Sequence, residues 1–251
     1  MAELAAPQAH RVNEAFAGNL LLATMSSEDR DLIESEGELI RLAPGDVVLS
    51  RGDRVQASVF PIGSTMVSMA IDLADGRTAE VALIGQDGAV GGIISCGHAP
   101  AFTRAIALSG GAAYRVPMAA LEEAKRRSPF ISNLFCRLSD YLLSQVMQSV
   151  ACNAFHSIEQ RAARWLLMAQ DRAGDRIQLT QQGLADLLGV QRTTVNAVLQ
   201  GYERDGLIHT GRGVIEILDC DGLRARSCEC YQRLAEHFAA VIGPSGHGPA
   251  S

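Results

Sequence analysis

The sequence predicts an α+β protein with an antiparallel β-domain first, one long amphipathic helix next, and a helix-turn-helix with a β-hairpin near the C-terminus. Three observations lead to this prediction. Short β-prone runs alternate with turn residues between residues 38 and 116. Apolar residues then recur at helical spacing through residues 129–153. Finally, two short helical patterns and a glycine-centred hairpin fill residues 179–218.

The composition is ordinary for a globular protein. The chain has 251 residues, of which 47% are hydrophobic and 20% charged, and its formal net charge is -6. No run reaches the ~18 apolar residues that a membrane span needs. Glu3 precedes every basic residue, so we expect no secretory signal and place the protein in the cytoplasm. The six cysteines are scattered without a Cys-x-x-Cys pair, which favours reduced thiols over a disulfide scaffold.

The N-terminal part begins with helical patterns and continues as strands. Residues 10–36 are predicted as two short helices, the second opening at Ser26-Ser27-Glu28. Asp75-Gly76 marks a hairpin between two of the runs that follow. The predicted strands cover residues 39–42, 47–49, 58–62, 66–73, 78–84, 102–108 and 112–116.

Two helices are expected after the strands, one from Pro117 to about Arg127 and a long one from Ser128-Pro129 to about Asn153. One face of the long helix is continuously apolar and needs a partner. We expect a second copy of the same helix, and hence a homodimer; packing on the chain's own β-domain is the alternative. The predicted interface residues are Ile131, Leu134, Leu138, Leu142, Val146 and Val150.

Residues 157–172 form another amphipathic pattern, and a helix-turn-helix follows. Thr180 can cap its first helix, and Gly189 suits the left-handed position after that helix. A second helix is predicted from about Gln191 to Arg204. The turn Gly211-Arg212-Gly213 then joins two short strands, which form a wing.

A winged helix-turn-helix reads double-stranded DNA with the start of its second helix. The residues expected to contact DNA are Thr180, Gln191, Arg192, Thr193, Thr194, Asn196 and Arg212. Arg192 can donate two hydrogen bonds to guanine, with a phosphate contact as the alternative. Arg212 is placed for a phosphate, or is a solvated turn residue.

With these motifs the chain resembles the Crp/Fnr family of bacterial transcription regulators. The resemblance is most specific at NAFHSIEQRAARWLLM (153–168) and LTQQGLADLLGVQRTTV (179–195). It implies a cyclic-nucleotide-binding-like β-roll as a sensor, with its dimerisation helix, over residues 1–154. A winged helix-turn-helix domain then spans residues 155–251. It also implies an inverted-repeat operator, with RNA polymerase and an unidentified small molecule as candidate partners. No membrane partner is expected.

The chain departs from this family in both parts. In the DNA-reading motif Thr193 stands where the family often has Glu, and Ala197 where it has a second Arg. In the sensor, Gly91 is followed by Gly92 rather than the Glu that cAMP binders carry. Ala101-Phe102 stands in place of their Arg-Ser pair, so we do not expect cAMP as the effector.

The candidate effector pocket consists of Gly91, Gly92 and Arg104. Arg104 alternates with apolar residues on one strand face and can point into the roll toward an anionic effector; an edge salt bridge is the alternative. The cofactor is left unknown.

Metal and cofactor chemistry is not expected from the cysteines. No cysteine precedes Cys96, which argues against an iron–sulfur cluster, and Cys96-Gly97-His98 is a weak haem motif. Cys228 and Cys230 point to different sides if both lie on one helix, so no metal site is predicted and a redox role stays open.

The sequence argues against two other functions, an enzyme and a regulatory module that acts on a protein partner. An enzyme is not expected, because the sequence shows neither a His-x-His metal set nor a Ser-His-Asp or paired-carboxylate motif. A cyclic-nucleotide module acting on a protein partner is disfavoured by the wing and the second helix of the helix-turn-helix.

Overall fold

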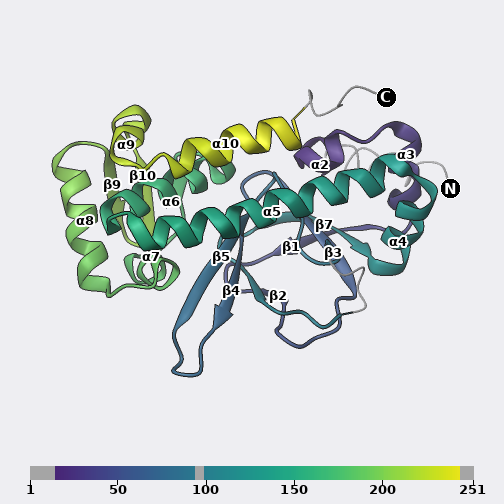
Figure 1. Ribbon diagram of the computed structural model, residues 1–251, viewed down its shortest axis with the longest axis horizontal. Helices are drawn as coiled ribbons and strands as arrows, with labels where there is room; N and C mark the ends of the chain where they lie inside the picture. The colour runs from purple at the N-terminus through teal and green to yellow at the C-terminus, as the bar shows by residue number, and fades with distance from the viewer. Residues whose placement is uncertain (1–14, 94–98, 244–251) are drawn as a thin grey trace.

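The computed structural model describes residues 15–93 and 99–243 of the chain. Its N-terminal part contains a β-roll made of two antiparallel sheets. One sheet has the strand order β1-β7-β3 and the other β2-β6-β4-β5 (Figure 1). The strands are β1 (Glu38–Leu42), β2 (Val47–Leu49), β3 (Ala57–Pro61), β4 (Val67–Asp72), β5 (Thr78–Ile84), β6 (Arg104–Ala107) and β7 (Gly111–Pro117). All seven predicted strands are confirmed to within two residues at each end.

Three helices close one end of the roll. The short helix α2 (Leu20–Ala23) is capped by Asn19, whose side chain also donates to the carbonyl of Pro61 at 2.9 Å. Helix α3 (Ser27–Glu34) begins as predicted, with Ser26 as its cap and two acidic residues in its first turn. Helix α4 is Met118–Arg127. The core between helices and sheets includes Phe16, Phe60 and Tyr114, all almost fully buried.

Helix α5 (Pro129–Phe155) is the long predicted helix, and it lies across the roll (Figure 1). Four of the residues predicted for the dimer interface are instead buried within their own chain. They are Ile131, Leu134, Leu138 and Leu142, each at most 6% exposed. Residues of the same chain therefore cover this part of the apolar stripe. The prediction that these four residues form the dimer interface is wrong. The expected alternative, packing on the β-domain, holds for these four of the six residues.

A different face of α5 is exposed. Val146 and Val150 of the predicted set are 36% and 66% exposed. Leu143 and Met147 lie beside them at helical spacing and are also exposed, at 52% and 60%. These four residues are called the α5 apolar face below.

The C-terminal part packs around α6 (Ile158–Ala173). Its sheet has the order β8-β10-β9, with β8 (Arg176–Ile177), β9 (Ile208–Gly211) and β10 (Val214–Ile217). Its further helices are α7 (Gln181–Leu188), α8 (Arg192–Arg204), α9 (Cys220–Arg226) and α10 (Cys230–Val241). The sequence reading assigned no structure after the wing, yet α10 runs back beside α5 (Figure 1), where the rings of Tyr141 and Phe238 are 4.9 Å apart.

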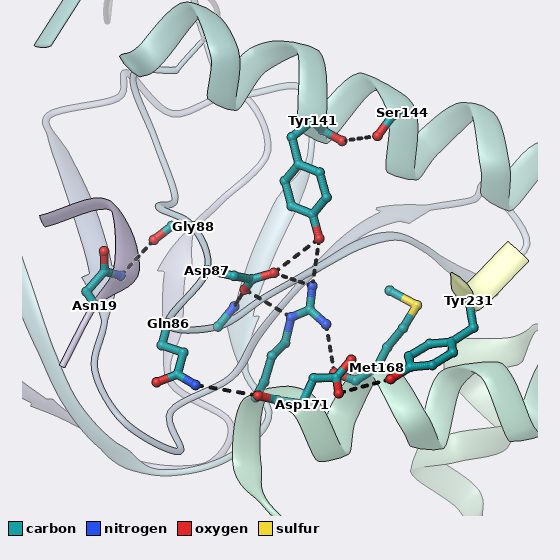
Figure 2. A network of polar contacts seen from close by, with 11 residues as sticks. Asn19, Gln86, Asp87, Gly88, Tyr141, Ser144, Met168, Asp171 and Tyr231 are labelled. Atoms are coloured by element: carbon teal, nitrogen blue, oxygen red, sulfur yellow. Dashed lines mark hydrogen bonds and ion pairs between the residues drawn. The ribbon is translucent and has the colours of Figure 1, made fainter. Parts of the chain in front are cut away.

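A buried polar network joins the roll to α6 (Figure 2). Arg172 makes a two-pronged contact with Asp87, at 3.1 Å from Nε and 2.5 Å from one terminal nitrogen. The Tyr141 hydroxyl donates to the same carboxylate at 3.2 Å. A Cβ at Gly85 would lie 2.7 Å from Arg172 Cγ, so only glycine lets the arginine approach this loop. The network fixes α6 against the end of β5.

A second contact across this boundary involves Glu80 of β5. It accepts hydrogen bonds from Trp165 Nε1 at 2.7 Å and from the Ser68 hydroxyl at 2.6 Å. Burial raises the pKa of Glu80 to about 7, against the lowering effect of both hydrogen bonds and of Arg172 and Arg164 nearby. No helix in the described part of the chain is long and apolar enough to cross a membrane.

Candidate nucleic-acid interface

The helix-turn-helix consists of α7 and α8 joined by a tight turn. Thr180 caps α7 by accepting from the Gly183 amide at 3.0 Å. Gly189 ends α7 in the left-handed conformation with φ of 67°, as predicted, and the Val190 amide then donates to the Ala185 carbonyl at 3.0 Å. Gln191 precedes the first residue of α8. Local sequence therefore dictates where α7 begins and ends.

Helix α8 has one buried and one exposed face. Val195, Leu199 and Tyr202 are buried in the C-terminal core, and the Tyr202 hydroxyl donates to the Glu159 carbonyl at 2.5 Å. This anchoring leaves the first turn outward, on the side away from α6 (Figure 1). The outward residues there are Gln191, Arg192, Thr193 and Thr194, which are exposed, and Asn196, which is half-buried.

The wing is the hairpin of β9 and β10. Val214 pairs with Gly211 across the turn, and Gly213 takes a φ of 73° that suits glycine. Arg212 stands exposed at the tip. Thr180 is exposed as well, but its hydroxyl already caps α7. The predicted DNA-contacting residues thus occupy the start of α7, the start of α8 and the wing tip.

Comparison with known proteins bears on this geometry. Residues 160–226 match the model of the Crp-like helix-turn-helix domain. A stretch of 61 residues is 48% identical to the HTH-type transcriptional regulator Cmr of Mycobacterium tuberculosis. That stretch is 24% of this chain, and it spans 25% of the relative's length.

Solved structures extend the likeness to the whole fold. FixK2 from Bradyrhizobium japonicum superposes with a TM-score of 0.66 at 15% identity, over 76% of this chain and 98% of that one. A Crp/Fnr transcriptional regulator from Thermus thermophilus gives a TM-score of 0.60 at 21% identity, over 78% and 98%. The chain therefore shares the fold of these structures, and residues 160–226 are similar to the Crp-like helix-turn-helix domain. The Mycobacterium tuberculosis relative and the Thermus thermophilus protein are both named as transcriptional regulators.

The residues of the predicted effector pocket lie apart in this chain. Gly91 and Gly92 have positive φ, and a Cβ there would meet the Ala57 carbonyl at 2.5 Å and Met118 Cε at 2.2 Å. Arg104 instead bonds to Asp72 at 2.8 Å, where β6 begins and β4 ends, and both side chains are partly exposed. The pKa of Asp72 is lowered, chiefly by this hydrogen bond.

Arg104 also lines a groove of about 700 Å³ between the roll and α7, and this groove includes neither glycine. The prediction that the three residues form one pocket inside the roll is therefore wrong. The salt-bridge alternative for Arg104 is confirmed. The strand alternation correctly placed Arg104, Ile106 and Leu108 on one face, but this face lines the groove, while Ala105 and Ala107 on the other face are buried. It could not reveal Asp72 as the partner of Arg104.

The sequence did not lead us to predict one cluster of possible metal ligands. Cys152, His156, Cys228 and Cys230 lie together where α5 ends and α10 begins. Cys228 precedes α10 while Cys230 is its first residue, so the argument that they point to different sides of one helix does not apply. The spacing Cys152-x-x-x-His156, one helical turn, followed downstream by Cys-x-Cys, was the available signal. The Cys96-Gly97-His98 motif lies outside the described residues.

Proposed function

We propose that this chain is a sequence-specific DNA-binding regulator that reads an inverted-repeat operator as a homodimer. The observation that carries the proposal is the outward first turn of α8, which holds Arg192 free of any ion pair within the described residues. Its position at the helix start matches the way helix-turn-helix proteins place side chains in the major groove.

The roles within the interface follow from side-chain chemistry. The flat guanidinium of Arg192 can donate to both O6 and N7 of guanine, which a lysine ammonium cannot match. Thr193, Thr194 and Asn196 can each reach a base edge or a phosphate, and Gln191 lies at the same helix start. Arg212 at the wing tip is suited to a phosphate. Thr180 contributes mainly by fixing the start of α7.

The α5 apolar face supports the dimer. Leu143, Val146, Met147 and Val150 are exposed in the protomer although their spacing makes a continuous apolar stripe. A second copy of α5 would bury the same residues on both chains, as two-fold symmetry requires. The two α8 helices would then lie about one DNA turn apart, roughly 34 Å, and select an inverted repeat.

The roll, residues 1–154, would act as the sensor and residues 155–251 as the DNA-binding domain, in a cytoplasmic protein. We propose an effector other than cAMP, because Arg104 is already paired with Asp72 and does not face Gly91 or Gly92. A phosphate there would have to break that ion pair. RNA polymerase remains the candidate protein partner.

The test is selection of DNA from random oligonucleotides by the full-length chain, followed by titration of single-base variants of the selected site. The expected result is an inverted repeat with one guanine in each half that Arg192→Ala no longer distinguishes, at a cost of ~1–3 kcal/mol. If Arg192→Ala weakens every variant equally, the residue contacts phosphate only. If no site is enriched, the proposed function is wrong.

A further inference from the structure

Four potential metal ligands converge at the joint between the long helix and the C-terminal part. Cys152 belongs to the last turn of α5, and His156 ends that helix. Cys228 and Cys230 flank the start of α10. Their ligand atoms, three Sγ and one imidazole nitrogen, all lie within 4.8 Å of one another. The three thiols are almost fully buried, at 0%, 4% and 0% exposure.

Two of the distances between these atoms are close to the edges of a tetrahedral coordination shell, and all of the distances are within 4.8 Å. Zinc bonds of about 2.3 Å to sulfur give sulfur–sulfur edges of about 3.8 Å, and mixed sulfur–nitrogen edges are slightly shorter. Cys152 Sγ and Cys228 Sγ are 3.6 Å apart. Cys230 Sγ and His156 Nδ1 are 3.4 Å apart. A single ion fits between groups at such distances with only small side-chain adjustments.

The surroundings are also those of a metal site rather than an apolar thiol cluster. The other nitrogen of His156, Nε2, lies 3.3 Å from the Glu229 carboxylate, which would hold the ring with Nδ1 toward the ion. Gln148 Nε2 donates to Cys230 Sγ at 2.9 Å. The buried guanidinium of Arg164 lies near Cys152 and bonds to Ser149 at 3.1 Å.

We propose that Cys152, His156, Cys228 and Cys230 bind one Zn²⁺ ion in a closed structural site. Four protein ligands with sulfur and nitrogen donors in a tetrahedron are the zinc pattern, and a full shell leaves no position for substrate. Binding releases a proton from each of the three thiols. Three thiolates and one Zn²⁺ leave a single negative charge, which the Arg164 guanidinium offsets.

The location assigns a role to the ion. Ser157, directly after His156, caps α6, so the ligands sit at the two-residue link through which α5 passes into the C-terminal part. The cysteines at the start of α10 connect the same point to the helix that runs back along α5 (Figure 1). The ion would therefore fix the direction in which α6 and the winged domain leave α5. This role holds whether or not the operator proposal is correct.

The test measures metal in the full-length chain purified under reducing conditions, by elemental mass spectrometry. We expect one zinc per chain, and loss of the ion in Cys228→Ser and Cys230→Ser. Glu229→Gln should keep the fold and weaken zinc affinity by about 10-fold to 100-fold, since it removes only the carboxylate behind His156. Cys220→Ser and Cys136→Ser are matched controls outside the cluster and should keep the ion.

A measurement on the unaltered chain covers the case in which a cysteine variant fails to fold. The chelated protein is titrated with Co²⁺, and a visible absorption of tetrahedral thiolate-bound cobalt, displaced by one equivalent of Zn²⁺, supports the site. A reduced chain that holds no zinc and gives no such spectrum overturns the proposal. Loss of zinc in Cys220→Ser or Cys136→Ser to the same extent overturns it as well, as does a Cys152–Cys228 disulfide in the chain isolated with reductant.

Discussion

Glu80 should make the stability of this protein depend on pH in a direction opposite to that of ordinary ion-paired carboxylates. Its pKa is raised from 4.5 to about 7 because burial disfavours the charged form. In the unfolded chain the carboxyl ionises at its normal pKa. The folded state therefore has its full stability below about pH 4.5 and loses the contribution of Glu80 as the pH rises through 7.

The size of the loss follows from the shift. One pKa unit corresponds to about 1.4 kcal/mol, so the step from 4.5 to about 7 costs about 3 kcal/mol of folding free energy above pH 7. Glu80→Gln removes the charge and keeps an oxygen that can accept from Trp165 Nε1, together with a donor for the Ser68 hydroxyl. The variant should be up to about 3 kcal/mol more stable than the natural chain at pH 8, with a small difference at pH 5.

Denaturant unfolding at pH 5, 6, 7 and 8 provides the assay, followed by the fluorescence of Trp165, the one tryptophan of the chain. The indole donates to Glu80 itself, so the signal reports on this boundary between β5 and α6. Glu38→Gln, at an exposed carboxylate paired with Arg115, is the control and should change nothing between pH 5 and pH 8. Equal stability of the natural chain and Glu80→Gln at pH 8 would refute the reasoning.

Three further outcomes are expected. Leu143→Glu combined with Met147→Glu should give folded monomers in analytical ultracentrifugation, because the two substitutions put charges on the α5 apolar face. Leu138→Ala should instead lower the free energy of unfolding by ~2–5 kcal/mol and leave the oligomeric state unchanged, since Leu138 is buried within its own chain. A dimer that survives the double substitution would place the interface elsewhere. Arg212→Ala should weaken binding to all DNA sequences alike and lower the salt dependence by about one unit, as measured by titration at several salt concentrations, whereas an unchanged salt slope would mean that the wing tip does not touch phosphate. Calorimetry with cAMP should show no binding at micromolar concentrations, and tight binding would contradict the interpretation of the Arg104–Asp72 pair.

Local patterns were sufficient where the structure is decided within a few residues. The cap at Ser26, the left-handed Gly189 and the glycine turn of the wing all follow from the conformational preferences of individual residues. The boundaries of strands and helices follow from side-chain periodicity for the same reason.

The long helix shows what such patterns cannot predict. Periodicity identified the apolar stripe of α5 but not which element covers it, because a roll and a second helix bury the same leucines equally well. Only the packed chain reveals that Leu138 faces the roll and that Met147, on a neighbouring face, remains exposed.

The sequence by itself therefore determined the order of the main elements as far as the wing, the helix-turn-helix and its outward residues, since these depend on neighbours within one or two turns. The tertiary structure alone decided three other matters. It paired Arg104 with Asp72, it placed Glu80 against Trp165, and it brought the cysteines around α10 to the end of α5. Each of these contacts joins residues far apart along the chain, so its chemistry exists only once the chain has folded.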